Sequence, residues 1–331
     1  MQKAVRSAQD SSTGKEAVQS DMIESGLQAV EAVMSEIVES DVSILQDASH
    51  HILDAGGKRV RPRLLLLSYL AMGGEDIDYA APAAAAVELV HTASMVHDDI
   101  NDHGAIRRGR PSVNAIWGRT FALLTGDFLF TKVYELMAPY RDLNILLAEA
   151  TVALVEGETL QASAVKEGNL TRERYQQIIA RKTAALFKAS TTLGARLVGA
   201  DEAHVTALGE YGYNIGLAFQ IVDDILDLTA DSETLGKTAG IDIAQGKGFL
   251  SAYDDTDGNN GATSTHRSGD IADDPIDAIR RKMLEGDTLA QARTQAQQLM
   301  RHAVSFLDDL PPSDAANDLR SLAVQLVERQ H

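Results

Sequence analysis

The feature that most constrains the fold of this chain is the periodicity of its apolar residues. They recur three and four positions apart along almost the whole sequence, and the alternation typical of a half-buried strand is absent. Glycine pairs and prolines mark the ends of several segments. The pattern predicts an all-α protein with helices over 21–38, 41–55, 60–72, 78–103, 119–138, 142–166, 171–189, 201–230, 276–285, 288–309 and 313–329.

Two segments fall outside this helical pattern. Residues 1–20 are polar, and they predict a mobile tail before a single helical domain over 21–331. Residues 251–275 are rich in Asp, Gly, Ser and Thr, which is typical of a long exposed loop. We expect this acidic loop to be an insertion within the domain, because the amphipathic helices after it need a surface on which to pack.

The charge of the chain limits its possible partners. Its 331 residues have a formal net charge of −18, with 48 carboxylates against 30 lysines and arginines. Such a negative field disfavours nucleic acid and anionic membranes as partners. The excess of aspartate and the low lysine content are typical of a salt-rich cytoplasm, so we expect a halophilic origin. The absence of cysteine and of a long apolar run predicts a cytoplasmic protein without a membrane span.

The pattern Asp-Asp-x-x-Asp occurs three times. The copies at 98–102 and 223–227 each end a long apolar helical run, whereas the copy at 273–277 contains Pro275 and lies at the end of the acidic loop. Residues four apart share one face of a helix, so the outer aspartates of a copy point the same way. Their charges repel unless a cation neutralises them, and carboxylate oxygens suit Mg²⁺. We interpret the first two copies as metal sites and the third as a solvated coincidence.

Two clusters of basic residues contrast with the acidic background. The segment GGKRVRPR (56–63) contains four cations, and RRGR (107–110) contains three arginines. Solvated basic patches are the simpler explanation. Clustering in so acidic a chain favours an anion site, because arginine binds phosphate oxygens bidentately. Carboxylates for metal ions together with separate cations predict a protein that binds two phosphorylated substrates, one through metals and one directly.

Taken together, these segments resemble the all-trans isoprenyl diphosphate synthases. The resemblance covers roughly residues 25–330 and rests on GGKRVRP, ELVHTASMVHDDINDHGAIRRGRPS, LLTGDFLF, RKTAALF, GLAFQIVDDILD and LGKTAGIDIAQGK, in the order of the family. It implies the isoprenoid synthase fold, in which antiparallel helices surround a deep central cavity. It also implies a prenyltransferase that condenses isopentenyl diphosphate with an allylic diphosphate, whose ionisation is assisted by three Mg²⁺ ions.

The resemblance also implies roles for individual residues. The catalytic aspartates would be Asp98, Asp99, Asp102, Asp223, Asp224 and Asp227, of which Asp98, Asp102 and Asp223 would face the metal ions. The isopentenyl diphosphate site would comprise Gly57, Lys58, Arg61, His91 and Arg108. The allylic diphosphate site would comprise Arg107, Lys182, Thr183, Gln220, Lys237 and Lys247. The sequence after Lys247 departs from the Thr-Leu-Pro stretch that is usual in the family.

The residues before the first aspartate bear on product length. In the family, a bulky aromatic residue four or five positions before that aspartate stops chain growth early, and here these positions hold Ala93 and Ser94. Side chains one turn before Asp98 would lie just below the reacting carbon. We expect a product longer than fifteen carbons, with C20–C25 favoured and a longer quinone-tail product as the alternative. Phe128 and Phe130 are candidates for a deeper limit.

Three other functions can be weighed on the sequence. A terpene cyclase would share the metal chemistry, but such enzymes use many aromatic rings to steer cations, and aromatics are only 5% here. A phosphohydrolase with His–Asp ligation could use His91 and His97, but it would leave the second aspartate motif unexplained. A non-catalytic partner subunit would have eroded aspartate motifs, whereas both are intact. We expect a homodimeric enzyme.

Overall fold

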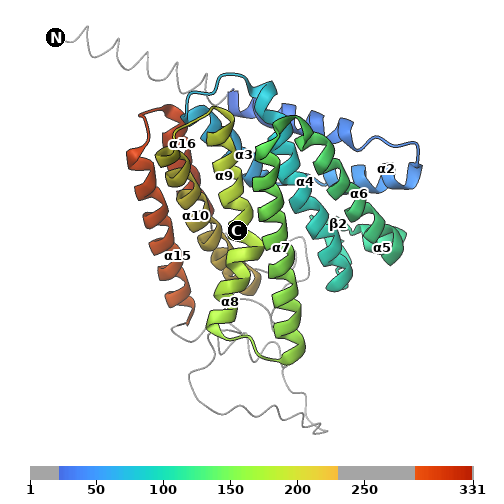
Figure 1. Ribbon diagram of the computed structural model, residues 1–331. Helices are drawn as coiled ribbons and strands as arrows, with labels where there is room; N and C mark the ends of the chain where they lie inside the picture. The colour runs from blue at the N-terminus through green and yellow to red at the C-terminus, as the bar shows by residue number, and fades with distance from the viewer. Residues whose placement is uncertain (1–21, 230–287, 330–331) are drawn as a thin grey trace, which may run out of the picture.

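The computed structural model of the protein describes residues 22–229 and 288–329. Figure 1 shows these residues as a bundle of helices. The helices are 22–37, α2 (Ser43–Leu53), α3 (Val60–Ala71), α4 (Ile77–Asn101), α5 (Val113–Trp117), α6 (Arg119–Met137), α7 (Asp142–Glu167), α8 (Arg172–Ile179), α9 (Ala185–Leu197), α10 (Glu202–Thr229), α15 (Thr288–Ser305) and α16 (Asp314–Glu328). The 3₁₀ turns are Ala138–Tyr140 and Phe306–Asp309, and a π-helical turn covers Ala180–Ala184.

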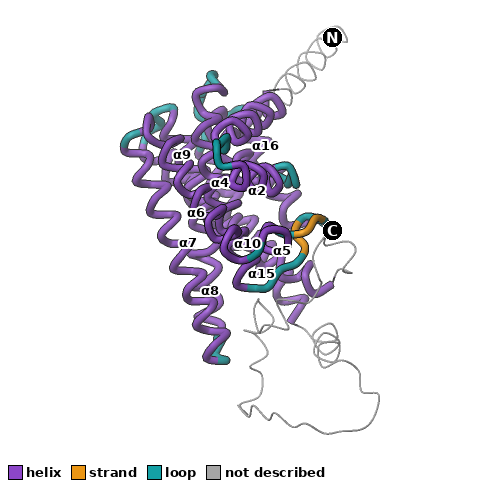
Figure 2. Tube along the Cα trace, turned by 90° about the vertical axis from the view of Figure 1, so that its right-hand side faces the viewer, coloured by secondary structure: helices purple, strands orange, loops and turns teal. Residues whose placement is uncertain are grey.

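The all-α prediction is confirmed, with two additions that the sequence pattern missed. The first is a hairpin of β1 (Ile106–Arg107) and β2 (Arg110–Pro111), which Figure 2 shows in orange beside α5. Its strands of two residues are too short for an alternating pattern. The second is α5, a single helical turn and a half. None of the described helices combines the length and the apolar character that a membrane span requires.

One predicted helix boundary was wrong. The helix expected over 171–189 runs on to Leu197, as α8, the π-helical turn and α9 in succession. Several other predictions fall outside the described residues. These are the N-terminal tail, the helix over 276–285, the acidic loop over 251–275, the third aspartate copy, Lys237 and Lys247.

The helices that carry the aspartate motifs lie in the interior of the bundle. Helix α4 is buried over most of its circumference and packs against α3, α6 and α9. Helix α10 packs between α9 and α15, and Figure 1 shows these three side by side with α7. The main apolar core lies among α3, α4, α6 and α9, and a second cluster joins α8, α10 and α15.

Glycines let two helices approach the π-helical turn very closely. A Cβ atom added to Gly157 of α7 would lie 2.6 Å from the backbone nitrogen of Lys182. One added to Gly216 of α10 would lie 2.7 Å from the Cα of Ala184. These separations are too short for any side chain, so the turn is held between α7 and α10 by direct backbone packing. π-helical turns are rare and occur frequently at functional sites.

Candidate active site

The first aspartate motif lies where α4 ends. The amide of Asp102 donates to the carbonyl of Asp98 at 2.8 Å and continues the helical pattern by one residue. His103 then adopts a left-handed conformation with φ 54°, and the amide of Gly104 donates to the carbonyl of Asp99 at 2.9 Å. A Cβ on Gly104 would lie 2.7 Å from the Asp99 carboxylate. The chain therefore turns back sharply and brings the hairpin against the end of α4.

Asp99 is bound by the arginine that this turn returns to it. Its Oδ1 accepts from Nε of Arg107 at 3.0 Å and from Nη2 at 2.5 Å, and its side chain is 2% exposed. Burial raises the pKa of Asp99, and the guanidinium of Arg107 acts in the opposite direction. The buried Asp99 thus pairs with the half-buried Arg107, the residue that the resemblance assigns to the allylic diphosphate site.

Asp98 faces the π-helical turn. Its Oδ2 lies 3.4 Å from Nζ of Lys182, which also donates to Glu158 at 2.9 Å and to Gln161 at 2.8 Å. Glu158 and Gln161 both come from α7. Burial raises the pKa of Glu158 to about 7, and Lys182 limits that rise. The α7 side chains therefore fix the ammonium group beside the first aspartate motif.

A chain of hydrogen bonds leads from the same turn to the second motif. The hydroxyl of Thr183 donates to Gln220 at 2.7 Å, and the amide of Gln220 donates to Asp224 at 2.8 Å. The hydroxyl of Tyr175 donates to the other oxygen of Asp224 at 2.7 Å. Because Lys182 and Thr183 are adjacent, the π-helical turn connects the two aspartate motifs. Asp227, one helical turn beyond Asp223, is 3% exposed.

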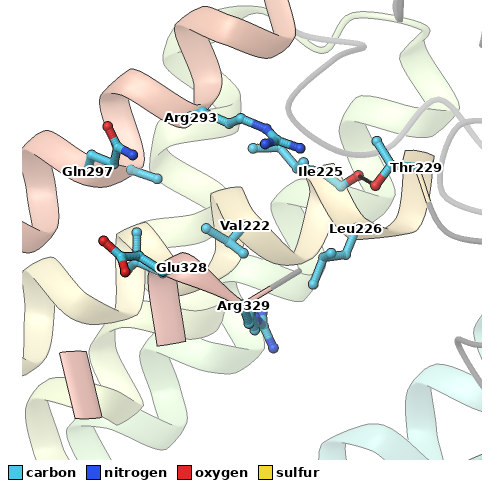
Figure 3. A pocket seen from close by; sticks show the side chains of 10 residues that line it. Val222, Ile225, Leu226, Thr229, Arg293, Gln297, Glu328 and Arg329 are labelled. Carbon is cyan, nitrogen blue, oxygen red and sulfur yellow. Dashed lines mark hydrogen bonds between the residues drawn. The ribbon is translucent and has the colours of Figure 1, made fainter. Parts of the chain in front are cut away.

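Asp223 is paired with the C-terminal end of the described chain. Nη2 of Arg329 donates to its Oδ1 at 2.9 Å, and the guanidinium lies 4.3 Å from the ring centroid of Phe219. Arg329 also lines a cavity of about 650 Å³ whose walls come from α10, α15 and the last described residues, and Figure 3 shows it there. The residues lining this cavity are Val222, Ile225, Leu226, Thr229, Arg293, Ala296, Gln297, Val327, Glu328 and Arg329.

The cations of the segment 56–63 separate in the structure. Lys58 is exposed, and Arg63 donates to Glu24 at the surface at 2.7 Å. Arg59 and Arg61 are both buried. A solvated patch is therefore wrong as an explanation for Arg59 and Arg61, because burying a guanidinium requires compensating partners.

Arginines converge on His91, two helical turns before Asp98. Burial lowers its pKa well below the usual value, and the charges of four arginines act in the same direction; these are Arg61, Arg108, Arg107 and Arg59. Burial also lowers the pKa of Arg61 to about 10, and its guanidinium lies 5.0 Å from the ring centroid of Phe187. His91 is therefore neutral at physiological pH, in a pocket of concentrated positive charge.

The glycine pair before this cluster supports Arg108. Nη1 of Arg108 donates to the carbonyl of Gly56. Gly57 has φ 148°, and a Cβ there would lie 3.0 Å from Cζ of Arg108. Glycine is required at this position by both its conformation and the space available. The predicted residues Gly57, Arg61, His91 and Arg108 thus lie together, with Lys58 exposed at their edge.

The two residues expected to influence product length lie within α4. Ala93 is fully buried, and Ser94 is 8% exposed with its hydroxyl donating to the carbonyl of His91 at 2.9 Å. Phe128 and Phe130 are half-buried on α6, and Phe130 lies 5.9 Å from the ring of His97. Ser94 and Asp98 are four residues apart and share one face of the helix.

Comparison with known proteins decides the family. Residues 42–258 match the family described as polyprenyl synthetase. The chain is 39% identical over 297 residues to a short chain isoprenyl diphosphate synthase of Methanothermobacter thermautotrophicus, an alignment that covers 86% of this chain and 90% of the relative. The chain belongs to the polyprenyl synthetase family. The predicted family and enzyme class are thereby confirmed, and this polyprenyl synthetase is a prenyltransferase.

Other relatives of this polyprenyl synthetase differ in the product named for them. It is 35% identical over 298 residues to an octaprenyl diphosphate synthase of Haemophilus influenzae, with 88% of this chain and 90% of the relative covered. Among solved structures, it is similar to a polyprenyl synthase of Caulobacter crescentus in complex with calcium and isoprenyl diphosphate. That similarity has a TM-score of 0.84 and 32% identity, and it covers 94% of this chain and 97% of the other.

Several residues of this site were missed by reasoning from the sequence. They are Glu88, Glu158, Gln161, Tyr175 and Arg329. Glu88 had a detectable signal, because a lone carboxylate in an apolar helical run must find a buried partner. The other four lie on amphipathic or terminal segments, where a polar residue is ordinary.

Proposed function

We propose that this polyprenyl synthetase condenses isopentenyl diphosphate with an allylic diphosphate to give an all-trans polyprenyl diphosphate. The observation that carries the proposal is the link between the two aspartate motifs. Lys182 contacts Asp98, and its neighbour Thr183 leads through Gln220 to Asp224. Carboxylates and a cation converge there from α4, α10 and the π-helical turn, which suits a substrate that carries a diphosphate.

The donor set fits a hard divalent cation, which we propose to be Mg²⁺. Among the described residues, no three carboxylate or imidazole side chains are grouped closely enough to form a complete cage by themselves. Mg²⁺ is usually held by one or two carboxylates together with substrate phosphates and waters. Asp98, Asp102 and Asp223 would supply those carboxylates to three ions. When bound, the ions would stabilise the negative charge that develops on the departing diphosphate.

The protein's own groups would complete the allylic diphosphate site. Lys182 is held in place by α7 and brings a fixed positive charge beside Asp98. Such a preorganised charge stabilises the leaving diphosphate as the allylic C–O bond breaks. Arg107 would add a second positive charge to the allylic diphosphate site, held in position by its pairing with Asp99. Lys237 and Lys247 are proposed from the resemblance alone.

The arginines around His91 would bind isopentenyl diphosphate directly. The positive charges of Arg61 and Arg108 repel each other, and an anionic ligand would relieve that repulsion. Neutral His91 can donate one hydrogen bond and accept another. The isopentenyl double bond would attack the allylic cation to form the new C–C bond. The proton lost from the adduct would pass to the released diphosphate, so that no side-chain base is needed.

The length of the product is a further part of the proposal. Small buried side chains at Ala93 and Ser94 place no aromatic ring on the face of α4 that precedes Asp98. We propose a product of C20–C25. The relatives support chain elongation but differ in length, from short chain to octaprenyl, so a longer quinone-tail product is the alternative.

We also propose that the enzyme is a homodimer in the cytoplasm. Exposed large apolar side chains are concentrated on α5, α6 and α7, for example Tyr134 at 66%, Ile145 at 58% and Val152 at 58%. Apolar surface of this kind marks interaction sites. Light scattering of the purified protein should give twice the mass of the chain, and a monomeric mass at micromolar concentration would contradict the dimer.

The function is tested by incubating the protein with isopentenyl diphosphate and allylic primers of five to twenty carbons. We expect condensation products only when a divalent cation is present, and chromatography of the dephosphorylated alcohols gives their length. Products that are cyclic, or inorganic phosphate released without condensation, would contradict the proposal. They would favour the cyclase and phosphohydrolase alternatives, respectively.

A further inference from the structure

Glu88 is a buried carboxylate that none of the roles above uses. It lies in the apolar part of α4, one helical turn before His91, and its side chain is 2% exposed. A carboxylate that is removed from water in this way strongly destabilises the fold unless cations compensate it. The groups around Glu88 therefore indicate what it does.

Two arginines lie within ion-pair distance of Glu88, and its charge acts on a third. Its Oε1 lies 3.1 Å from Nη1 of Arg59 and 4.0 Å from Nη2 of Arg108. Its charge also acts on Arg61, as the first of the carboxylates that favour the charged form of that residue. Among the described residues, Oε2 of Glu88 and Nε of Arg61 are both buried without a hydrogen-bond partner. The pocket thus holds strong polar groups whose bonding is incomplete.

Arg59 alone does not explain this carboxylate. Arg59 has a left-handed backbone with φ 45° at the start of α3, and it is already bound by Glu31 and by the carbonyl of Leu53 at 2.9 Å. Glu31 comes from the helix over 22–37 and is 46% exposed, so it contacts Arg59 from the solvent side. Glu88 contacts Arg59 from the interior, where it also lies 4.0 Å from Arg108.

We propose that Glu88 is a positioning residue that holds Arg61 and Arg108 ready for the diphosphate of isopentenyl diphosphate. The inference rests on the proposed function, and it adds a residue that does not itself touch the substrate. Two like-charged guanidinium groups without a shared counter-ion would move apart towards solvent. The charge of Glu88 would keep them directed into the pocket, and the incoming diphosphate would complete their bonding.

The proposal predicts a selective defect in Glu88→Gln, which keeps the shape of the side chain and removes its charge. Loss of positioning should raise KM for isopentenyl diphosphate about tenfold. Losing one hydrogen bond to a charged group typically weakens binding by about that factor or more. KM for the allylic primer and kcat should each stay within about twofold. The lost interaction binds isopentenyl diphosphate equally in the ground state and the transition state, so its loss changes KM and not kcat. Calorimetry with isopentenyl diphosphate and metal-free protein should show the same weakening in Kd.

Glu31→Gln is the matched control, because it removes the other carboxylate on Arg59 and leaves the interior of the pocket unchanged. We expect it to bind isopentenyl diphosphate as the wild type does. If both variants shift KM equally, or if Glu88→Gln changes both substrates alike, Glu88 acts through the fold and the proposal is overturned. A wild type without condensation activity would instead contradict the proposed function.

Glu88→Asp keeps the experiment decisive if the glutamine variant does not fold. The aspartate retains the charge but shortens its reach by one methylene. A rise in KM for isopentenyl diphosphate alone, with a thermal unfolding transition close to that of the wild type, supports positioning. An aspartate variant with unchanged KM for both substrates would overturn it.

Discussion

The two aspartate motifs have the same sequence pattern but are fixed in different ways. In each, the middle aspartate is bound by the protein itself, Asp99 by Arg107 and Asp224 by Tyr175 and Gln220. Arg107 is only 8 residues from Asp99, whereas Tyr175 is 49 residues from Asp224. The partner of Asp223, Arg329, is 106 residues away. The middle aspartate of the first motif is therefore fixed by a local turn, whereas the second motif also depends on partners that are distant in the sequence.

This difference bears on two properties of the site, its catalytic activity and its contribution to the stability of the fold. In the first motif, Asp99 is fixed by the end of α4 and the hairpin that follows it, while Asp98 faces Lys182. The second depends on the contacts of α8, α10 and the C-terminal residues with one another. The π-helical turn joins the two, because Lys182 faces the first motif and Thr183 the second. We therefore expect the motifs to be equally important for catalysis but unequal in what they contribute to stability.

The largest expected effect is on turnover, and it is the same for both motifs. Asp98→Ala and Asp223→Ala should each reduce kcat by about a thousandfold or more, because each removes charge that stabilises the leaving diphosphate through metal ions. Both variants should retain the thermal unfolding transition. Asp142→Ala, at an exposed position in the first turn of α7, serves as a control and should be fully active. Near-normal kcat in both motif variants would contradict the metal assignment.

The second effect should distinguish the motifs by their stability. Arg107→Ala leaves the Asp99 carboxylate buried without its partner, and we expect it to lower the free energy of unfolding by about 3 kcal/mol. Tyr175→Phe removes one hydrogen bond to Asp224 and leaves the one from Gln220. It should lower the free energy of unfolding by about 1 kcal/mol. Urea denaturation of the two variants measures both values. Equal losses would show that the local turn is no more important to the fold than the distant contact.

How much of this site the sequence predicts also depends on whether a contact is local or joins distant segments. Asp98 and Asp102 could be placed on one helix face from their spacing alone. The contact of Asp98 with Lys182 and the pairing of Arg107 with Asp99 were not predicted. Thr183 and Gln220 could be assigned only through resemblance, since nothing in their own segments marks them as partners. Arg329 was not predictable, because its contact with Asp223 depends on how the last helix packs.

The fold shows the same division between local and tertiary causes. The periodicity of apolar residues predicted most helices, because a buried stripe follows the helix repeat whatever it packs against. It missed the π-helical turn and the continuation to Leu197. The turn depends on close backbone approach at Gly157 and Gly216, and a pattern of apolar residues carries no information about such an approach.

The third expected effect is a change in product length caused by substitutions on α4. Ala93→Phe or Ser94→Phe adds a ring on the helix that leads to Asp98, and we expect the product to shorten by at least one five-carbon unit. Val222→Phe is the matched control, because Val222 lies on α10 and lines the cavity of Figure 3. It should leave product length unchanged. If both α4 variants yield the wild-type length, this face of α4 does not line the growing chain.

The smallest expected effect is a pH dependence of stability that arises from His91 on α4. The folded-state pKa of His91 is lowered by burial and by the neighbouring arginines, whereas its usual value is 6.5. Below that value the unfolded chain binds a proton that the folded protein does not, so His91 makes stability fall as pH decreases. His91→Gln should lose less stability than the wild type between pH 7 and pH 5. Parallel melting temperatures across this range would contradict the assignment of a neutral His91 in the folded protein.

The central claim is that the two motifs act as one unit on a single diphosphate. A double-mutant cycle on kcat with Asp98→Ala, Asp223→Ala and the combined variant tests it most directly. Residues that act together are strongly non-additive, so the combined variant should lose about as much activity as the more damaging single variant. Losses that multiply would show that the motifs act independently, and that would contradict the account.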